Sequence, residues 1–361
     1  MASSAAAASR MPVYFVSHGG PNLLDSKDYP PSDAISQGLS KIGSEILGLN
    51  PRALLIVSGH WEAGATTLQV NSKTGIEQPL IYDFHGFPSW MYKEEFPHRL
   101  DPELAHQVSS ILNSANIPTE IVDRGLDHGV WVVLKKAGLA NAPFPIVQLS
   151  LFHNDSMQKH VELGETLASL RDQGVVIVGS GMAVHNLRDL FTSRSQGVPS
   201  YVPAFDKQIE DALTSSYDNR KQAMVELEHS DYLRKAHPTL EHLMPLHVAT
   251  GAAKDSSRVK KMLEAYQFSL SCKLLSMTGT TAIHNFPDPA GIHTGRGFDD
   301  LSPNERDQFI NELELDFRRY LAENRSSKGF VFYPNTRQIM RTISSLYQTI
   351  SSIDFSDSFT L

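Results

Sequence analysis

Residues 53–61 read ALLIVSGHW, and this stretch decides the fold. Five consecutive apolar residues, Ala53–Val57, run through a serine and a glycine into His60. A short unbroken apolar run of this kind is typical of a strand buried on both faces of a parallel sheet. Because open α/β sheets bind ligands just beyond the carboxyl ends of their strands, His60 is a candidate functional residue.

The same arrangement occurs earlier in the chain, where the predicted strand Pro12–Ser17 is followed directly by His18. Between the two strands, Ser32–Leu49 has apolar residues at helical spacing and ends at Asn50-Pro51. The opening is therefore βαβ with a parallel crossover. We expect an α/β fold with a mostly parallel central sheet flanked by helices, and further strands at residues 144–151, 175–179 and 269–277.

Composition limits the classes of function. With 361 residues, the chain is long enough for one large domain or two modest ones. Its net charge of −8 argues against non-specific binding to nucleic acid. The single cysteine, Cys272, excludes an intramolecular disulfide and a cysteine-rich zinc site and fits a reducing compartment, so we expect a cytoplasmic protein. No apolar run approaches the roughly 18 residues that a membrane helix needs, so we expect no membrane partner.

The sequence divides into three parts. Residues 1–10, MASSAAAASR, form a small-residue tail that lacks the apolar centre of a secretory signal and is expected to be disordered. Residues 11–283 hold the predicted strands of the main domain. Residues 284–361 begin with a stretch rich in Gly, Pro and Asp, continue with two amphipathic stretches, and are predicted to be a largely helical C-terminal extension. Their apolar faces must cover the main domain, each other or a partner subunit, and the last case would be a homo-oligomer.

Four histidines follow a predicted strand or a tight glycine-containing turn: His18, His60, His128 and His185. For any one of them, a bond to backbone at a strand end is the ordinary explanation, but four such placements in one domain favour a shared site. Imidazole ligands suit Zn, Fe, Cu and Ni, and two histidines with a third N or O ligand and open positions are typical of a non-haem Fe(II) oxygenase or a catalytic zinc site. The third ligand should come from a distant segment, where the candidates are His237, Glu241 and His242.

A nucleophilic serine is the competing interpretation, because Ser180 follows the predicted strand Val175–Gly179. The surrounding residues do not form G-x-S-x-G, since Met182 stands where glycine is needed. No G-x-G-x-x-G follows the first strand and no P-loop is present, so nucleotide binding is not supported.

Five motifs, each weak alone, occur in one order along the chain. They are MPVYFVSHGGP at Met11–Pro21, SGHW at Ser58–Trp61, DHG at Asp127–Gly129 with Trp131, VHNLR at Val184–Arg188, and PTLEHLMPL at Pro238–Leu246. Together they resemble the class III extradiol ring-cleavage dioxygenases, the LigB superfamily, and most of all its DOPA 4,5-dioxygenase-like branch. The resemblance spans about residues 11–280 and implies that residues 11–283 are a catalytic domain of this class.

The resemblance also implies roles for individual residues. His18, His60 and His242 match the metal ligands, with Glu241 as the alternative third ligand because protocatechuate-type members use a glutamate. His185 matches an active-site acid/base that is a fourth ligand in some zinc-bound relatives, and His128 matches a second-sphere histidine that faces the substrate. The expected cofactor is Fe(II), with Zn(II) as the alternative. Residues expected to wall the substrate or meet its carboxylate are Trp61, Phe84, Phe87 and Arg188.

The expected function is therefore a metal-dependent extradiol dioxygenase that cleaves the ring of a catechol, DOPA-like or related, with O₂. Its partners would be a small aromatic diol and O₂. The alternatives are a metal-binding protein without oxygenase activity, like the Memo proteins of the same superfamily, and a zinc hydrolase. Two features depart from the family: Gly20 stands where a small hydroxyl residue is frequent, and the extension beyond residue 284 has no counterpart in compact members.

Overall fold

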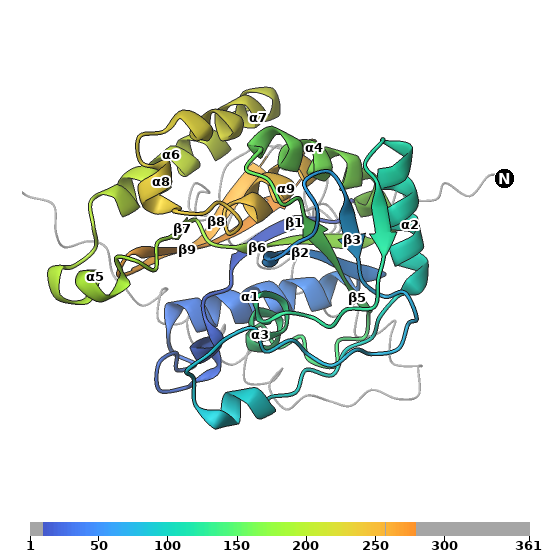
Figure 1. Cartoon of the computed structure of the whole chain (residues 1–361), viewed down its shortest axis with the longest axis horizontal. Helices are drawn as coiled ribbons and strands as arrows, with labels where there is room; N and C mark the ends of the chain where they lie inside the picture. Colours follow the sequence, from blue (N-terminus) through green and yellow to red (C-terminus); the bar gives the residue numbers. More distant parts are fainter. Residues whose placement is uncertain (1–9, 257, 279–361) are drawn as a thin grey trace, which may run out of the picture. The chain divides into compact units, whose positions relative to one another are not determined.

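The computed structural model describes residues 10–256 and 258–278. The predicted tail, apart from Arg10, and the whole predicted extension at residues 284–361 lie outside the described residues. Within the described part, the strands form one sheet in the order β4-β3-β5-β2-β6-β1-β9-β7, with β8 paired to β9 (Figure 1). The strand bounds are β1 Val13–Ser17, β2 Ala53–Glu62, β3 Leu68–Val70, β4 Thr119–Ile121, β5 Ile146–Leu151, β6 Val175–Gly181, β7 Val184–His185, β8 Arg258–Gln267 and β9 Leu270–Thr278.

The centre of the sheet is parallel, as predicted. Strand β6 pairs in parallel with β1 on one side and with β2 on the other, and β2 pairs in parallel with β5. Antiparallel pairs lie on both sides of this centre, since β9 runs against β1, β7 and β8, and β3 runs against β5, while the outermost strand β4 is parallel to β3. The expected last strand is therefore present as β9, but it belongs to a hairpin with β8, and two strands joined by a short turn must be antiparallel.

Strand β8 was not predicted from the sequence. Its residues, RVKKMLEAYQ, carry several charges and show no apolar alternation, and most of them are partly or fully exposed. Charged side chains of this kind are typical of edge strands, because they discourage pairing with another chain. The same charges remove the periodic signal that would identify the strand.

The decisive stretch is buried on both faces, as its composition predicts. Ala53, Leu55 and Val57 pack into one core cluster, whereas Leu54 and Ile56 pack into the other. All five side chains are fully buried. The alternation arises because successive side chains of a strand point to opposite faces of the sheet.

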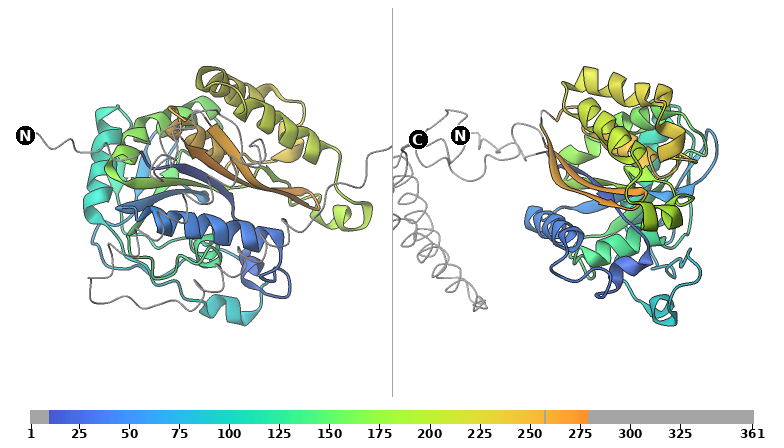
Figure 2. Two further views of the ribbon diagram at one scale, coloured as in Figure 1. Left: turned by 180° about the vertical axis from the view of Figure 1, so that it is seen from behind. Right: turned by 90° about the vertical axis from the view of Figure 1, so that its left-hand side faces the viewer.

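Helices cover both faces of the sheet (Figures 1 and 2). Helices α1 and α3 supply apolar residues to one core cluster, and α2, α4, α6 and α9 supply them to the other. The helix bounds are α1 Ala34–Leu49, α2 Pro102–Ser114, α3 His128–Lys136, α4 Met157–Leu167, α5 Leu190–Gln196, α6 Tyr201–Leu213, α7 Tyr217–Glu226, α8 Leu233–Ala236 and α9 Met244–Ala252.

Helix ends follow local capping chemistry. The Asp33 side chain accepts hydrogen bonds from the backbone of Ile35 and Ser36 and so starts α1, which ends at Asn50 in the left-handed conformation. The sequence predicted this helix, but it did not predict α3. The residues of α3, HGVWVVLKK, are almost all buried, so they lack the apolar and polar faces that mark a surface helix.

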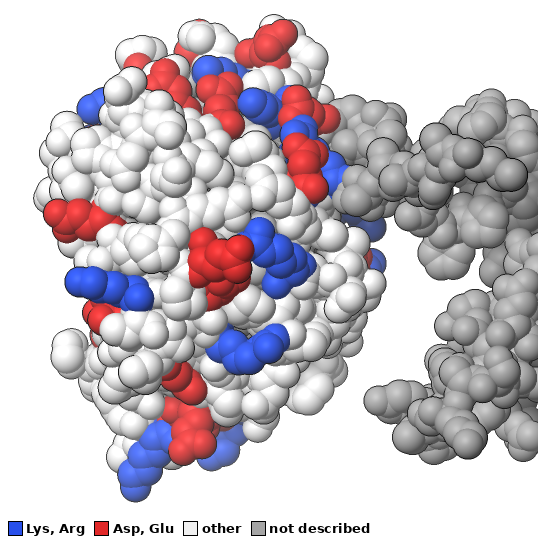
Figure 3. All heavy atoms as spheres, turned by 90° about the vertical axis from the view of Figure 1, so that its right-hand side faces the viewer, with Lys and Arg blue, Asp and Glu red and all other residues white. Residues whose placement is uncertain are grey.

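No helix of residues 10–256 and 258–278 is both long and apolar enough to cross a membrane. On the face drawn in Figure 3, acidic and basic side chains are interspersed over a largely uncharged surface.

Candidate active site

The sheet brings two of the predicted histidines to one edge. In β1 Ser17 lies opposite Gly181 of β6, and in β2 Ser58 lies opposite Ser180 of the same strand. His18 follows the end of β1, as predicted. His60 is still within β2, which continues to Glu62 with an irregular register after Val57, so the strand is longer than its apolar run.

Three imidazoles converge through the same ring atom. The Nε2 atoms of His18 and His60 are 3.2 Å apart, and the Nε2 atoms of His60 and His242 are also 3.2 Å apart. The rings of His18 and His242 lie with their centroids 5.1 Å apart. His242 comes from the segment between α8 and α9, 224 positions after His18, so only the folded chain assembles this group.

Glycines make this approach sterically feasible. A Cβ at Gly181 would lie 2.2 Å from the carbonyl oxygen of His242, and a Cβ at Gly59 would lie 3.1 Å from its Cα. The backbone of His242 is held here because its carbonyl accepts a 2.8 Å hydrogen bond from the Met182 N–H. Side chains at either glycine position would push His242 away from His18 and His60.

The hydrogen bonds of His18 fix where its proton lies. Its Nδ1 is 3.1 Å from the Ser180 hydroxyl, which itself donates to the Gly129 carbonyl at 2.5 Å. Since that hydroxyl has only one proton and gives it to the carbonyl, its oxygen accepts from His18 Nδ1–H. A neutral His18 therefore presents an unprotonated Nε2 to the other rings.

Carboxylates accept the Nδ1 protons of the other two rings, those of His60 and His242. His60 Nδ1 lies 3.2 Å from Asp83 Oδ2, and His242 Nδ1 lies 3.0 Å from Glu241 Oε1. A carboxylate is an acceptor only, so each Nδ1 carries the proton and each Nε2 is bare. Hydrogen-bonded partners on the second ring nitrogen are typical of histidines that bind metals.

The donor set fits a metal ion. Metal–nitrogen bonds of about 2.0–2.1 Å place neighbouring ligand nitrogens about 3 Å apart, close to the spacing found here. Burial, followed by the repulsion of the neighbouring histidines, lowers the pKa of His18 and of His242 well below the ordinary value. Both rings are therefore in the neutral form that a metal requires.

Proximity alone groups these residues differently from the Nε2 contacts. Donor atoms within 4.8 Å of one another form two sets, His18, His60 and His128, and His185, Glu241 and His242. In the second set, Glu241 accepts from His242 Nδ1, and in the first, Asp83 accepts from the Nδ1 atoms of both His60 and His128. The Nε2 trio of His18, His60 and His242 draws on both sets and is defined by its contacts, because His60 Nε2 lies 3.2 Å from the Nε2 of each of the other two.

His128 is the first residue of α3 and not part of a free turn. Asp83 Oδ1 accepts from its ring Nδ1 at 2.9 Å and from its backbone N–H at 3.0 Å. The ring lies beside that of His60, with centroids 4.1 Å apart. Burial raises the pKa of Asp83, but the hydrogen bonds from His128 and His60 outweigh it, so the net pKa lies well below the ordinary value and the carboxylate is ionised.

His185 lies on the other side of the group. It belongs to β7, opposite Leu270 of β9, and its ring stacks on that of His242 with centroids 3.7 Å apart and an angle of 13°. Burial and the neighbouring His237 lower the pKa of His185 to about 4. The ring is thus neutral at physiological pH.

The structure also places the remaining candidates. His237 lies fully buried with its Nε2 2.8 Å from the Ala183 carbonyl, outside the trio of facing nitrogens. Phe84 packs edge-on against His128 with centroids 5.7 Å apart, and against Phe87 at 5.6 Å. The loop that carries them therefore lies against the histidines. Trp61 instead packs under the guanidinium of Arg124, 4.3 Å from its ring.

The expected role of Arg188 stays a prediction, whereas Ser180 differs from the nucleophile first considered. The Arg188 backbone N–H donates to the Asn186 side chain. Ser180 is fully buried with its proton given to a carbonyl, so it supports His18 and is not an exposed nucleophile. Sequence reasoning missed Asp83, whose only signal is a lone carboxylate inside the aromatic stretch IYDFHGFPSW.

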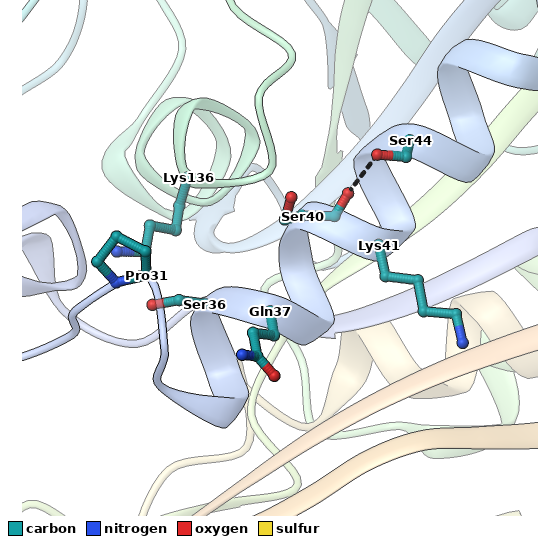
Figure 4. A pocket seen from close by; sticks show the side chains of 7 residues that line it. All are labelled: Pro31, Ser36, Gln37, Ser40, Lys41, Ser44 and Lys136. Atoms are coloured by element: carbon teal, nitrogen blue, oxygen red, sulfur yellow. Dashed lines mark hydrogen bonds between the residues drawn. The ribbon is translucent and has the colours of Figure 1, made fainter. Parts of the chain in front are cut away.

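One surface hollow lies away from the histidines. It has a volume of about 500 Å³, is lined by residues of α1 and by the end of α3, and has no histidine or carboxylate in its lining (Figure 4). Its lining residues are Pro31, Ser36, Gln37, Ser40, Lys41, Ser44 and Lys136. Because it holds none of the converging groups, this hollow is not part of the candidate site.

Known proteins are similar to this chain in sequence over most of the described residues. A family model described as "Catalytic LigB subunit of aromatic ring-opening dioxygenase" matches residues 12–278. The 4,5-DOPA dioxygenase extradiol of Beta vulgaris is 34% identical over 251 residues, which are 69% of this chain and 89% of that protein. The protein of the same name from Escherichia coli K12 is 31% identical over 245 residues, which are 67% and 85% of the two chains.

A solved structure agrees with these matches. An uncharacterized protein from Escherichia coli K12 aligns with a TM-score of 0.59 and 28% identity, over 74% of this chain and 99% of its own. The family match covers β1 to β9, and therefore every histidine of the site. The chain belongs to the LigB family of aromatic ring-opening dioxygenases and is a ring-cleaving oxidoreductase.

Proposed function

We propose that His18, His60 and His242 hold a divalent metal, Fe(II) in the active protein, and that the chain uses it to cleave the ring of a catechol with O₂. The observation that carries this proposal is the convergence of three Nε2 atoms, with that of His60 lying 3.2 Å from that of His18 and 3.2 Å from that of His242. Without a cation, three lone pairs would face one another in a buried site. Zinc uses overlapping ligands and is the alternative occupant.

When bound, the metal lowers the pKa of the diol and brings it together with O₂. The chain supplies the proton chemistry. His185 is neutral because its pKa is about 4, so it can accept a proton from the second hydroxyl of the catechol. The Nδ1–H of His128 donates to Asp83, which leaves its Nε2 as an acceptor for a substrate hydroxyl.

The substrate class follows from the site and from the names of the relatives. Phe84 and Phe87 offer ring faces and edges beside His128, which suits an aromatic substrate. Several relatives are named for DOPA cleavage, so we propose a DOPA-like catechol. The location we propose is the cytoplasm, because a single buried cysteine fits a reducing compartment.

The test is a catechol panel. Protein purified without air is loaded with Fe(II), its metal content is measured, and L-DOPA, caffeate and protocatechuate are added with O₂. We expect the absorbance of a yellow ring-opened product with at least one of them, and its loss in His18→Ala. No turnover of any catechol by protein that carries iron would refute the proposal, and ester hydrolysis by the zinc form alone would point to a hydrolase instead.

A further inference from the structure

Asp83 differs from Ser180 and Glu241, which accept the Nδ1 protons of His18 and His242, because each of its two oxygens contacts a different imidazole. Oδ1 accepts from the backbone N–H and the ring Nδ1 of His128, at 3.0 and 2.9 Å. Oδ2 lies 3.2 Å from Nδ1 of His60. One carboxylate thus contacts an imidazole from β2 and another from the start of α3.

The loop that carries Asp83 is fixed to α3 and not free to adjust. The Trp131 indole N–H donates to the Ile81 carbonyl at 3.2 Å, and the Ile81 N–H donates to the Leu126 carbonyl at 2.9 Å. Asp83 is only about a quarter exposed. The carboxylate therefore meets both rings from a fixed direction.

We infer that Asp83 is a positioning residue that sets the tautomer of His60, and that the site requires a carboxylate here because two oxygens must accept at once. This inference rests on the proposed metal site, since the tautomer matters because it leaves Nε2 of His60 bare. It concerns hydrogen-bond polarity: an amide of the same shape has one acceptor and one donor end.

The structure identifies which histidine an amide would disturb. In Asp83→Asn, the amide oxygen must occupy the Oδ1 position, because one of the two donors there is the backbone N–H of His128, which cannot exchange its role. The amide NH₂ then faces Nδ1 of His60. His60 can accommodate it only by moving its own proton to Nε2, where the proton points at His18 and His242.

Glu241 provides the matched comparison. Its Oε1 accepts both from His242 Nδ1 and from the Thr239 hydroxyl, each at 3.0 Å. A glutamine can present its single amide oxygen to both donors, so Glu241→Gln keeps the polarity that His242 needs. The same carboxylate-to-amide change is thus predicted to be severe at Asp83 and milder at Glu241.

The experiment has two readouts on folded protein. The first is ¹⁵N NMR of the histidine rings without metal, which reports the tautomer, with the His60 signals assigned by their loss in His60→Gln. The second is Zn(II) affinity by competition with a chelator. In Asp83→Asn we expect His60 to change to the Nε2–H form and the affinity to fall about 10- to 100-fold, the usual effect of losing an outer-shell partner. In Glu241→Gln we expect a smaller loss of affinity and an unchanged His242 tautomer.

A second variant, Asp83→Ala, separates the effect of hydrogen-bond polarity at position 83 from the effect of side-chain shape. Alanine removes both acceptors but places no donor against His60, so water can accept the Nδ1 proton and the ring should keep more of the Nδ1–H form than in Asp83→Asn. A purely structural carboxylate predicts the reverse, since asparagine preserves shape and alanine does not. Asp33→Asn controls for the chemical change, because Asp33 caps α1 through one oxygen and asparagine caps equally well.

The outcomes are distinguishable from failure of the proposed function. If the wild type binds no metal but Asp83→Asn still changes the His60 tautomer, the metal proposal fails and the inference about Asp83 stands. An unchanged His60 tautomer in folded Asp83→Asn, or equal losses of affinity in Asp83→Asn and Glu241→Gln, overturns the inference.

Discussion

Gly129→Ala adds one methyl group at the point where α3 meets two of the facing histidines. Gly129 is the second residue of that helix, and alanine is favoured over glycine within helices by about 1 kcal/mol. Helix propensity alone therefore predicts a gain in stability. The surroundings predict a different result, because the new Cβ would lie 2.6 Å from Ser58 Oγ, 2.9 Å from His60 Cδ2 and 3.2 Å from His18 Cε1.

The displacement can be worked out from these distances. Restoring an ordinary 3.4 Å contact would move His60 Cδ2 by about 0.5 Å and His18 Cε1 by about 0.2 Å, whereas metal–ligand distances tolerate only about ±0.2 Å. Both carbons are bonded to Nε2 in the imidazole ring, so the shift reaches the facing nitrogens directly. We expect metal affinity to fall at least about tenfold, comparable to the loss of an outer-shell partner.

The assay pairs metal affinity, measured by chelator competition, with the free energy of unfolding in urea. Gly48→Ala is the control, because Gly48 lies near the end of α1 and a Cβ there meets nothing within 4 Å. It should gain up to about 1 kcal/mol of stability and bind metal like the wild type. If Gly129→Ala also binds metal like the wild type, the packing argument for the site is wrong.

Three further predictions concern the metal, the base and pH. Saturating the site at about 100 times Kd should raise the free energy of unfolding by about 2.7 kcal/mol over chelator-treated protein, and an unchanged unfolding midpoint would contradict a folded-state metal site. His185→Gln should lower kcat by about 10²- to 10⁴-fold while the metal affinity stays near that of the wild type, because His185 stacks on His242 and is not one of the three proposed ligands; a loss confined to metal binding would refute the acid/base role. Burial lowers the pKa of His160 to about 4. Between pH 6.5 and 4 the unfolded chain therefore binds a proton that the folded chain does not. This residue should lower the free energy of unfolding by about 1.4 kcal/mol for each pH unit as the pH falls through that range. His160→Phe should reduce the measured slope by that amount in urea titrations at pH 7, 6 and 5, with no change of slope above pH 7; an identical slope in both proteins would contradict the shift.

Local signals made much of the fold predictable. Ala53–Val57 is an apolar run because both of its faces are covered, and Asp33 starts α1 through contacts within three residues. Strand β8 and helix α3 were missed for opposite reasons. The first is charged because it is an edge, and the second is apolar all round because it is buried, so neither shows the periodicity on which prediction depends.

The candidate site also has residues that the sequence predicts and residues that it does not. Histidines at strand ends carry a signal in the sequence, because a strand followed by an imidazole is visible within ten residues. The acceptors of their Nδ1 protons carry none, since Ser180 lies 162 positions from His18 and Asp83 lies on a loop with no pattern of its own. Which oxygen meets which ring is decided by the packing of distant segments, and only coordinates supply it.

The charge of a bound cation would explain why the Nδ1 protons of His18, His60 and His242 have acceptors of different kinds, one hydroxyl and two carboxylates. Three neutral imidazoles bring no charge to a divalent cation, and His18 passes its proton to a neutral hydroxyl. In the proposed metal site, the two negative charges that would balance the ion are those of Asp83 and Glu241, each of which contacts a proposed ligand through Nδ1. Because neither carboxylate is a proposed ligand, both would neutralise the charge of the ion without occupying positions that the substrates need. A Glu241 that bound the metal in place of His242 would give up the hydrogen bond from His242 Nδ1, and so we propose the histidine as the third ligand.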